Sequence, residues 1–424
     1  MPRSRVPPID IVHLAYTTFP DDPRVKREAL AVSTAEWGGE GGHRVAVVAL
    51  RPLGARAVER HRGVTVIRVP GRKSRPRLLG YLRQYAGFVW RCRCLLARHP
   101  RLAHVKLVHV HTLPDFLVWA ATPARRRGAK LIFDMHEIFP EFARSRFSGA
   151  LGRLASTLAR ALERQARSRA DLTIVANQPI AGLLDARPLE RPERRIVIHN
   201  SADPLDLGPP ISPAPRASRG SLELIYHGTL TLPYGVDGAV RGVLHARQRG
   251  ADARLSILGD GPERSRLEQL VVSLSAAAVI RFEHPLPQRE LRARLGRADA
   301  VLVPTRLDAM TRYSLSNKLL EAVHLGIPVL AARLPSYSHY LDDASAWFWN
   351  PGDATDLVRA ILAFARATSE ERCERARAAQ RALQGIAWPV ERGRLLDAYR
   401  HLLEEDDRHA ARMVAIRSAA PPSP

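Results

Sequence analysis

Short apolar runs alternate with longer segments of helical periodicity along most of this 424-residue chain. The runs predict strands, and the segments between them carry apolar residues at the spacing of one helix face. Strands separated by helices pair in parallel through right-handed crossovers, so the first half predicts a doubly wound parallel sheet. The predicted strands of this half lie near Ile9–Tyr16, Arg44–Leu50, Val64–Val69, Leu107–His111, Lys130–Asp134, Leu172–Val175 and Ile196–His199.

A second series of strands follows a segment that has no apolar periodicity. The segment from Asp203 to Ser221 is rich in proline, glycine and serine, which predicts a linker between two domains. We therefore predict an N-terminal domain over 1–203, a linker over 204–221, a second domain over 222–388, a helix over 389–405 and a disordered tail over 406–424. The predicted strands of the second domain lie near Leu222–His227, Leu255–Leu258, Ile280–Glu283, Ala300–Val303, Val329–Ala332 and Ala346–Trp349.

The composition is that of a globular protein, with 46% hydrophobic and 25% charged residues. The three cysteines show neither metal-ligand spacing nor a disulfide framework, which suits a reducing cytoplasm. The start, MPRSRVPPID, lacks the apolar core of a signal peptide, and no apolar run approaches the roughly 20 residues that cross a bilayer. These features predict a cytoplasmic protein and are compatible with peripheral attachment to the inner face of the cell membrane.

The chain is strongly basic, with 65 basic against 42 acidic residues and a formal net charge of +23. Such a balance is typical of proteins that meet nucleic acid, anionic lipid or phosphate-bearing substrates. Only five of the 65 basic residues are lysine, so 60 are arginine. This skew resembles the codon bias of a GC-rich genome, so the total charge by itself says little about function.

The distribution of charge is more informative, because residues 60–114 contain no acidic residue. Within this stretch, segment 72–101 carries an apolar stripe at alternating spacings of four and three, which predicts a helix packed on the sheet. Its arginines and Trp90 would then form a basic, aromatic outer surface suited to an anionic membrane. The two roles are compatible. The stripe consists of Leu78, Leu82, Tyr85, Val89, Cys92 and Leu96.

The segment SNKLLEAVHLGIPVLA, Ser316 to Ala331, predicts a short amphipathic helix, a helix break and a buried strand. Lys318 and Glu321 lie three residues apart at the start of that helix. A helix N-terminus attracts anions, so a lysine there is unfavourable unless an anion lies close by. The alternative is an ordinary surface pair worth a few tenths of a kcal/mol.

A second motif lies about sixty residues upstream, in RLSILGDGPERSRLEQL, Arg254 to Leu270. An apolar strand ends at a turn that contains Gly259 and Gly261, and a helix pattern follows. Such a turn would let a ligand approach the backbone at the carboxyl end of a parallel strand, where open α/β sheets bind nucleotides. The third glycine of the dinucleotide fingerprint is missing, and a strand–turn–helix joint is also ordinary α/β construction.

Together these motifs resemble the C-terminal half of family 4 glycosyltransferases, in a subgroup with HGTL and SNKLLE motifs. The likeness continues in order through YHGTLTLPYGVDGAV and FEHPLPQRELRARLGRADAVLVPTR, and through HLAYTTFPDDPRVKREAL, VHVHTLPD, LIFDMHEIFPE, ADLTIVAN and VIHNSAD in the N-terminal half. It covers roughly residues 9 to 400. The resemblance implies the α/β GT-B fold, in which two doubly wound Rossmann-like domains face each other across a cleft, and retaining chemistry.

The resemblance assigns the nucleotide-sugar donor to the second domain. Glu321 matches the glutamate that binds the ribose, whereas the family's other glutamate is Tyr313 here, with Asp308 as a candidate substitute. Thr229 and Tyr234 stand where the family has an arginine and a lysine, so Lys318 is the candidate compensating cation. The donor-binding candidates are Gly228, Thr229, Gly259, Gly261, His284, Leu286, Ser314, Ser316, Asn317, Lys318, Leu319 and Glu321.

The resemblance also implies catalytic and acceptor-side residues. His136 follows a strand of the first domain, and a histidine at that position contacts the donor sugar near the reacting carbon in the family. With His136, Lys318 and Asp308 are the catalytic candidates, and Arg24, His111 and Glu137 are the acceptor-side candidates. A structural role for each histidine and a surface role for Arg24 are the alternatives.

No Asp-x-Asp triplet occurs in the chain, so we expect a metal-independent mechanism and no bound cofactor. The donor would be a nucleotide sugar, most simply UDP- or GDP-linked. The predicted function is retaining transfer of a hexosyl-type sugar to a glycan, a lipid-linked or a small-molecule acceptor, as in polysaccharide biosynthesis.

Three alternatives to this function stay open. The first is a nucleotide-sugar epimerase of the same fold, and the second is a basic nucleic-acid-binding protein on a degenerate scaffold. The sequence has no recognised nucleic-acid-binding module, so no specific nucleic-acid partner is expected. The third is a catalytically inactive homologue, because Thr229 and Tyr234 are uncharged.

Overall fold

The computed structural model of the chain describes residues 8–36, 43–71, 78–146, 149–215 and 220–418. The chain divides into two units, which we name unit 1 and unit 2. Unit 1 consists of Met1–Ala176, Leu183–Ile198 and Glu391–Pro424, and unit 2 consists of Asn177–Gly182 and His199–Val390. Each unit contains one doubly wound sheet, so the predicted pair of Rossmann-like domains is confirmed.

Unit 1 is built on an eight-stranded sheet with the order β3-β4-β2-β1-β5-β6-β7-β8. All seven predicted strands are present, and their pairings are parallel. The sequence missed β3, a short strand of half-exposed residues that pairs antiparallel with β4. The strands are β1 (Ile11–Thr18), β2 (Val45–Leu50), β3 (Val58–His61), β4 (Val64–Val69), β5 (Leu107–His111), β6 (Lys130–Met135), β7 (Leu172–Val175) and β8 (Arg195–Val197).

The helices of unit 1 begin where the sequence signals predict. Asp22 caps the first helix, since its side chain accepts hydrogen bonds from the backbone N–H groups of Arg24 and Val25, and proline occupies the first turn. The helices are α1 (Pro23–Ser33), α2 (Leu78–Arg98), α3 (Thr122–Arg125), α4 (Phe139–Arg146) and α5 (Gly149–Arg169), with 3-10 turns η1 (Pro100–Leu102) and η2 (Asp115–Ala121). Helix α6 (Gln178–Asp185) contains residues of both units.

The apolar stripe predicted for α2 packs inward as expected. Tyr85, Val89, Cys92 and Leu96 are buried, whereas Trp90 is 64% exposed. Residues 72–77 lie outside the described residues, as do the side chains of Leu78 and Leu82.

Unit 2 is built on a six-stranded parallel sheet with the order β11-β10-β9-β12-β13-β14. Every strand was predicted from the sequence within two residues at each end. The strands are β9 (Leu222–His227), β10 (Ala253–Leu258), β11 (Ile280–Glu283), β12 (Ala300–Val303), β13 (Val329–Ala332) and β14 (Trp347–Trp349).

Helices cover both faces of the second sheet, because alternate strand residues point to opposite sides. Leu224 and Tyr226 of β9 join a core with α8 and α13, whereas Ile225 joins a core with α10, α11 and α14. The helical segments are α7 (Pro204–Leu207), η3 (Leu232–Tyr234), α8 (Val236–Gln248), α9 (Arg264–Ser273), α10 (Gln288–Leu295), η4 (Thr311–Tyr313), α11 (Asn317–His324), α12 (Pro335–Ser338), α13 (Ala354–Arg366), α14 (Ser369–Leu383) and η5 (Gln384–Ile386).

The predicted linker over 204–221 is not a free connection in its described part. Its backbone is held by unit 2: Gln380 donates to the carbonyl of Ile211 at 2.8 Å, and Arg292 donates to that of Pro209 at 2.8 Å. Prolines remove backbone donors from this segment, and side chains of unit 2 also donate to the carbonyls of Gly208 and Pro213. The segment 204–215 is therefore fixed to unit 2, the linker assignment stays a prediction, and residues 216–219 lie outside the described residues.

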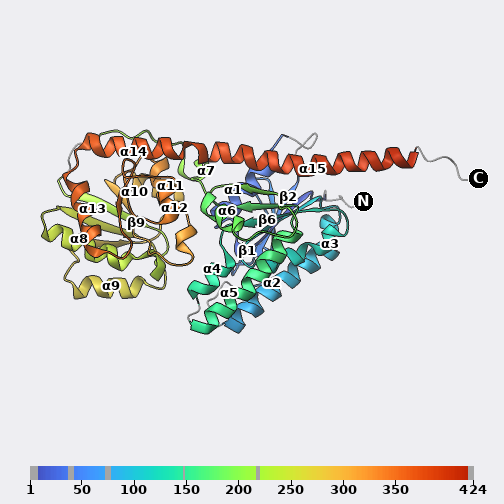
Figure 1. Cartoon of the computed structure of the whole chain (residues 1–424), viewed down its shortest axis with the longest axis horizontal. Helices are drawn as coiled ribbons and strands as arrows, with labels where there is room; N and C mark the ends of the chain where they lie inside the picture. Colours follow the sequence, from blue (N-terminus) through green and yellow to red (C-terminus); the bar gives the residue numbers. More distant parts are fainter. Residues whose placement is uncertain (1–7, 37–42, 72–77, 147–148, 216–219, 419–424) are drawn as a thin grey trace, which may run out of the picture. The chain divides into compact units, whose positions relative to one another are not determined.

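The C-terminal helix is longer than predicted. Helix α15 runs from Trp388 to Ser418, so the predicted break at 405 and the predicted disorder of 406–418 were wrong (Figure 1). The sequence from Glu404 to Ser418 contains neither glycine nor proline and is rich in alanine, arginine and acidic residues, which favour helix. Residues 419–424 lie outside the described residues. Among the helices that are described, none is both long and apolar enough to cross a membrane.

Candidate functional site

In unit 2, Lys318 lies against the glycine that follows β9. Gly228 has a φ of 112°, and a Cβ atom built there would lie 2.8 Å from Cε of Lys318, so this position requires glycine. The ammonium nitrogen lies 3.8 Å from the ring centre of Tyr234 and 5.3 Å from that of Tyr226. Both distances suit a cation–π contact. Tyr234, which the resemblance aligns with a cation of the family, thus contacts Lys318, the candidate to compensate for that cation.

Burial brings the pKa values of both charged groups at the helix start close to neutral pH. It lowers the pKa of Lys318 to about 8, against the raising effect of Glu321. Burial likewise raises the pKa of Glu321 to about 7, against the lowering effect of Lys318. The Glu321 side chain is 15% exposed, so the alternative of an ordinary surface pair does not describe this site.

His227, the last residue of β9, was not among the candidates. Its Nδ1 lies 3.5 Å from Oε2 of Glu321, and its Nε2 has no hydrogen-bond partner among the described residues. Burial, with the neighbouring Lys318 charge, lowers its pKa to about 3, so the ring is neutral. The sequence did offer a signal for His227, because it is a polar residue that ends an apolar strand just before a glycine.

The glycine turn after β10 is explained by the neighbouring loop. A Cβ atom at Gly259 would lie 1.9 Å from the carbonyl oxygen of Gly228, and one at Gly261 would lie 2.3 Å from that of Leu230. The N–H of Leu230 also donates to the carbonyl of Asp260 at 2.9 Å. The backbone that comes close to these two glycines is therefore that of the loop after β9. A donor-binding role for Gly259 and Gly261 stays a prediction.

Asp308 has a structural role in the structure. Its carboxylate accepts hydrogen bonds from the N–H groups of Met310 and Thr311 at 2.8 and 2.7 Å, which caps the turn before η4. Nothing in these contacts supports its use as the missing glutamate. Tyr313, at the position of that glutamate, offers its carbonyl to the side chain of Asn177 at 2.7 Å.

The remaining donor candidates lie at the carboxyl edge of the same sheet. Ser316 caps α11 through its backbone carbonyl, which accepts from Leu319, and the exposed Asn317 is the first helical residue. The carbonyl of Ser314 accepts from Ser336 at 2.8 Å. Two further candidates, His284 and Leu286, follow the edge strand β11, and Thr229 and Leu319 flank Gly228 and Lys318 in sequence.

In unit 1, Asp134 organises a buried polar network. Arg24 donates through Nε and Nη2 to its two carboxylate oxygens, at 2.9 and 2.7 Å, and through Nη1 to the carbonyl of Ile198 at 2.9 Å. Arg24 is only 4% exposed, so the alternative of a surface role was wrong. Bidentate pairing fixes the orientation of both side chains.

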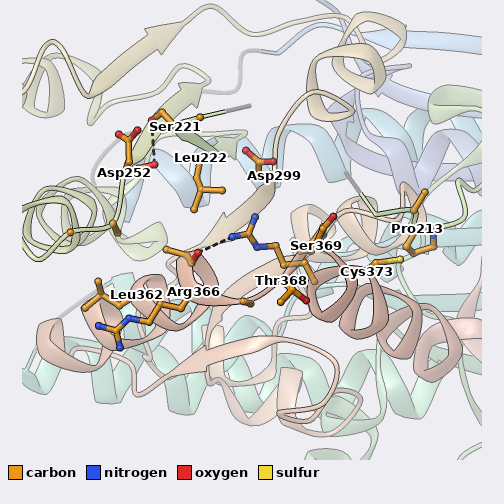
Figure 2. Close-up of a pocket in the computed structure, with 18 of the residues that line it drawn as sticks. Pro213, Ser221, Leu222, Asp252, Asp299, Leu362, Arg366, Thr368, Ser369 and Cys373 are labelled. Atoms are coloured by element: carbon orange, nitrogen blue, oxygen red, sulfur yellow. Dashed lines mark hydrogen bonds between the residues drawn. The ribbon is translucent and has the colours of Figure 1, made fainter. Parts of the chain in front are cut away.

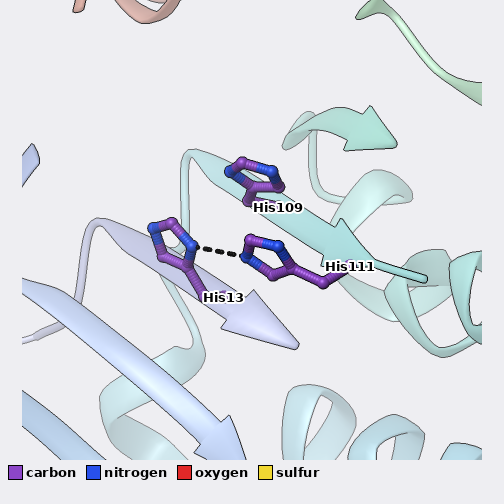
Figure 3. Close-up of side chains that lie close together, drawn as sticks. All are labelled: His13, His109 and His111. Atoms are coloured by element: carbon purple, nitrogen blue, oxygen red, sulfur yellow. Dashed lines mark hydrogen bonds between the residues drawn. The ribbon is translucent and has the colours of Figure 1, made fainter. Parts of the chain in front are cut away.

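Three histidines approach the same carboxylate. Oδ2 of Asp134 lies 3.1 Å from Nδ1 of His111, 3.2 Å from Nε2 of His136 and 3.5 Å from Nε2 of His109. Nδ1 of His111 is also 3.0 Å from Nε2 of His136. Figure 3 shows the other side of the His111 ring, where Nε2 lies 3.0 Å from Nδ1 of His13. The order of the strands explains the cluster, because β5 lies between β1 and β6, with His13 opposite His109 and His111 opposite Asp134.

Burial decides the charges of this network. It lowers the pKa of His13 and His111 well below the usual range, so both rings are neutral. Burial alone would raise the pKa of Asp134, but Arg24 and the surrounding histidines hold it well below its usual range. Burial raises the pKa of Glu28, whose carboxylate oxygens accept no hydrogen bond among the described residues. The network thus keeps one firm negative charge, on Asp134.

The same groups could hold a metal by ligand type and spacing. Ligand atoms of Glu28, His109, His111 and Asp134 all lie within 4.8 Å of one another. Arg24, however, contacts both carboxylates, with Nε 3.1 Å from Oε1 of Glu28, and its charge opposes a second cation.

The sequence foresaw only part of this network. It named Arg24, His111 and His136, but missed Asp134 and Glu28 as their partners. The signal was a polar residue within or at the end of an apolar run, as in IVHLAY and LIFD. Glu137, the remaining acceptor-side candidate, is exposed, and its N–H donates to Oγ1 of Thr112 at 3.3 Å.

Two family domains match the chain in succession. Residues 28–201 match the glycosyl transferase 4-like domain, and residues 221–366 match the domain of glycosyl transferases group 1. The chain belongs to the glycosyltransferases. Its fold is GT-B, as the resemblance implied: the sucrose-phosphate synthase of Thermosynechococcus elongatus matches with a TM-score of 0.75 at 16% identity, over 94% of this chain and 100% of that one.

Curated relatives support the family at sequence level. The putative colanic acid biosynthesis glycosyltransferase WcaL of Escherichia coli is 29% identical over 38% of this chain and 40% of its own length. The sulfoquinovosyl transferase SQD2 of Arabidopsis thaliana is 27% identical over 29% of this chain and 23% of its own length. The match thus spans well under half the length of either relative.

The glycosyltransferase also has a cavity of about 540 Å³ in unit 2, away from the candidate donor residues. Figure 2 shows Leu222, Asp252 and Asp299 beside Thr368 and Arg366 around it. Leu222, Asp252 and Asp299 lie where β9, β10 and β12 begin. The donor candidates Gly228 and Gly259 lie at the other edge of the sheet, where β9 and β10 end. Thr368 forms a capping box with Glu371 on α14, and Asp299 accepts from the N–H of Glu223 at 2.8 Å. These contacts hold the start of a helix and of a strand, and they give no argument for a ligand.

Proposed function

We propose that this protein is a retaining glycosyltransferase that moves a hexosyl-type sugar from a nucleotide-diphosphate sugar to a glycan, lipid-linked or small-molecule acceptor without a metal ion. The observation that carries the proposal is the contact of Lys318 with Gly228, beside Glu321, at the carboxyl edge of the unit 2 sheet. Open α/β sheets bind nucleotides at this edge.

In this proposal Lys318 stabilises the departing diphosphate. Its ammonium group lies near the start of α11, so the cation and the positive end of the helix dipole favour an anion at the same place. A fixed donor aimed at developing charge is worth roughly 3 kcal/mol. Glu321 would accept hydrogen bonds from the ribose hydroxyl groups. Both tasks need the charged forms of these residues.

Retention follows if the acceptor approaches on the face that the diphosphate leaves. The departing phosphate can then take the acceptor's proton, so no separate protein base is needed. His136 would orient the donor sugar, held in place by Asp134 and His111 at 3.2 and 3.0 Å. With its side chain 13% exposed, it is more accessible than the fully buried Asp134.

A UDP-linked sugar is the first donor to test. HepE of Anabaena, solved with UDP-glucose, matches the chain with a TM-score of 0.66 at 15% identity, over 93% of this chain and 100% of that one. This likeness concerns the fold, so the sugar and base remain to be measured. Thermal-shift screening of UDP, GDP, dTDP and ADP sugars would rank them, because a ligand that binds only the native state raises its stability.

The test is calorimetric titration of UDP-glucose into the wild type and the Glu321→Gln variant. Loss of a charged acceptor should weaken binding by roughly 1.5–3 kcal/mol, which is about ten- to a hundredfold in Kd. Glu290→Gln is the matched control, since Glu290 is exposed on α10 of the same unit. An unchanged Kd in Glu321→Gln would rule out the ribose role.

Product analysis separates the proposed transfer from the alternatives. Retaining transfer is supported if turnover of the donor requires an acceptor and the product has the same anomeric configuration as the donor. Release of the nucleotide with an altered free sugar in the absence of acceptor indicates an epimerase. A salt-sensitive shift with DNA that nucleotide sugars do not affect would instead indicate a nucleic-acid-binding protein.

A further inference from the structure

His227 lies on the face of the unit 2 sheet that α11 covers. It follows Ile225 by two residues, and alternate residues of a strand share a face. Ile225 is fully buried in the core that includes residues of α11, and His227 is only 4% exposed. The imidazole ring is therefore enclosed beside α11, where its Nδ1 lies 3.5 Å from Oε2 of Glu321.

The backbone at His227 is fixed by its neighbours. His227 is in register with Leu258 of β10, and the N–H of Gly228 donates to the carbonyl of Leu258 at 2.8 Å. Lys318 fills the place that a Cβ atom of Gly228 would need. The ring thus projects from a strand end that cannot shift easily, which is what a residue needs in order to orient another side chain.

The histidine brings a cost to the stability of this buried position. Its Nε2 has no hydrogen-bond partner among the described residues, and burial lowers its pKa to about 3, so the ring is neutral. A buried polar atom without a partner destabilises a folded protein, whereas an apolar ring of similar size at the same place would not. A histidine here therefore indicates a role other than stability.

The carboxylate of Glu321 offers such a role. Its side chain is 15% exposed, and its two oxygens together have about four lone-pair sites, of which two vicinal hydroxyl groups would use two. A neutral imidazole can donate one hydrogen bond to a remaining site and leave the negative charge in place. The 3.5 Å separation is longer than an ordinary hydrogen bond, and contacts of this kind often shorten when a ligand fills the site.

We propose that His227 is a positioning residue for Glu321, which donates through Nδ1 to Oε2 and holds the carboxylate in the orientation that accepts from ribose hydroxyl groups. The inference rests on the ribose role of Glu321 in the proposed function. It makes His227 a determinant of the preference for ribonucleotides over 2′-deoxyribonucleotides.

The test is calorimetric titration of UDP and GDP, each with its 2′-deoxy counterpart, into the wild type and variants of His227. The wild type should bind the preferred ribonucleotide about tenfold more tightly than its 2′-deoxy counterpart. His227→Phe should bind the ribonucleotide about tenfold more weakly and the 2′-deoxy compound almost unchanged. His227→Asn should recover most of the affinity, because its amide N–H can take the place of Nδ1. His245→Phe is the matched control, since His245 is exposed on α8 of the same unit.

Two further measurements separate positioning from a structural role. His227→Phe should melt no lower than the wild type, because it removes a buried nitrogen without a partner. Added to Glu321→Gln, it should weaken nucleotide binding no further, because both changes act on one contact.

The outcomes also separate this inference from the proposed function. If Glu321→Gln binds both ribonucleotides like the wild type, the ribose role fails and the inference fails with it. If Glu321→Gln binds weakly but His227→Phe binds like the wild type, only the inference is overturned. It is also overturned if His227→Phe loses affinity for ribonucleotide and 2′-deoxy compound alike and melts at a lower temperature, which would show that His227 is a structural histidine.

Discussion

The hydroxyl group of Tyr399 lies within hydrogen-bonding distance of Nδ1 of His109, 290 positions earlier in the chain. Both side chains are fully buried, and the same hydroxyl is 3.5 Å from Nε2 of His13. Helix α15 thereby completes the histidine network around Asp134 in unit 1. Through Tyr399, the C-terminal helix therefore helps to position the buried histidines of unit 1.

Tyr399→Phe should destabilise the protein by about 1–3 kcal/mol, because a buried ring nitrogen of His109 loses its partner and water cannot replace it. Urea unfolding measures this change. Tyr16→Phe is the control: its hydroxyl donates to Gln84 at 3.1 Å in a part-buried place that water can reach, so its effect should be smaller. Equal stability of Tyr399→Phe and the wild type would contradict the role of this hydrogen bond.

Donor affinity should be greatest between about pH 7 and pH 8. Below about pH 7 Glu321 gains a proton and stops accepting from the ribose hydroxyl groups, because its pKa is raised to about 7. Above about pH 8 Lys318 loses its charge, because its pKa is lowered to about 8. Calorimetric titration of UDP-glucose across this range measures both limbs.

Two variants assign the limbs of that profile. Glu321→Gln should remove the acid limb, and Lys318→Arg should remove the alkaline limb, because arginine stays charged over the whole range. If both limbs persist in both variants, other groups govern donor binding.

Activity should survive removal of divalent metals. The proposal assigns the charge of the diphosphate to Lys318, so dialysis against EDTA should leave turnover unchanged. Loss of turnover that magnesium or manganese restores would show that the assignment to Lys318 is wrong. If EDTA instead lowers the melting temperature, the protein holds a structural ion, and the group Glu28, His109, His111 and Asp134 is the first place to look for it by substitution.

His136→Ala should lower kcat by roughly two orders of magnitude, near 3 kcal/mol, if its contact with the sugar strengthens in the transition state. Nucleotide affinity should barely change, since the nucleotide candidates belong to unit 2 and His136 belongs to unit 1. Near-native kcat would refute the assignment. A melting temperature that falls steeply together with kcat would show that His136 is a structural histidine.

The strands and the fold class could be predicted from the sequence, because they depend on local patterns. Thirteen of the strands lie at apolar runs that any short window of the chain reveals. The missed strand β3 has polar, half-exposed residues and exists through its pairing with β4. The hydrogen bonds that fix 204–215 to unit 2 could not be predicted, because composition does not tell which distant side chains donate to a segment. The end of α15 was placed too early, although the local sequence of 404–418 favours helix.

The candidate site divides in the same way. The sequence by itself determined Lys318, Glu321 and the glycine turns, whose spacing lies within one helix start or one loop. Only the tertiary structure decided their partners, such as Tyr234 for Lys318 and the Gly228 carbonyl for Gly259. It also brought Arg24 to Asp134, 110 positions away, and Tyr399 to His109. Strand order and parallel register set these contacts, and both depend on packing across the whole sheet, which no local pattern encodes.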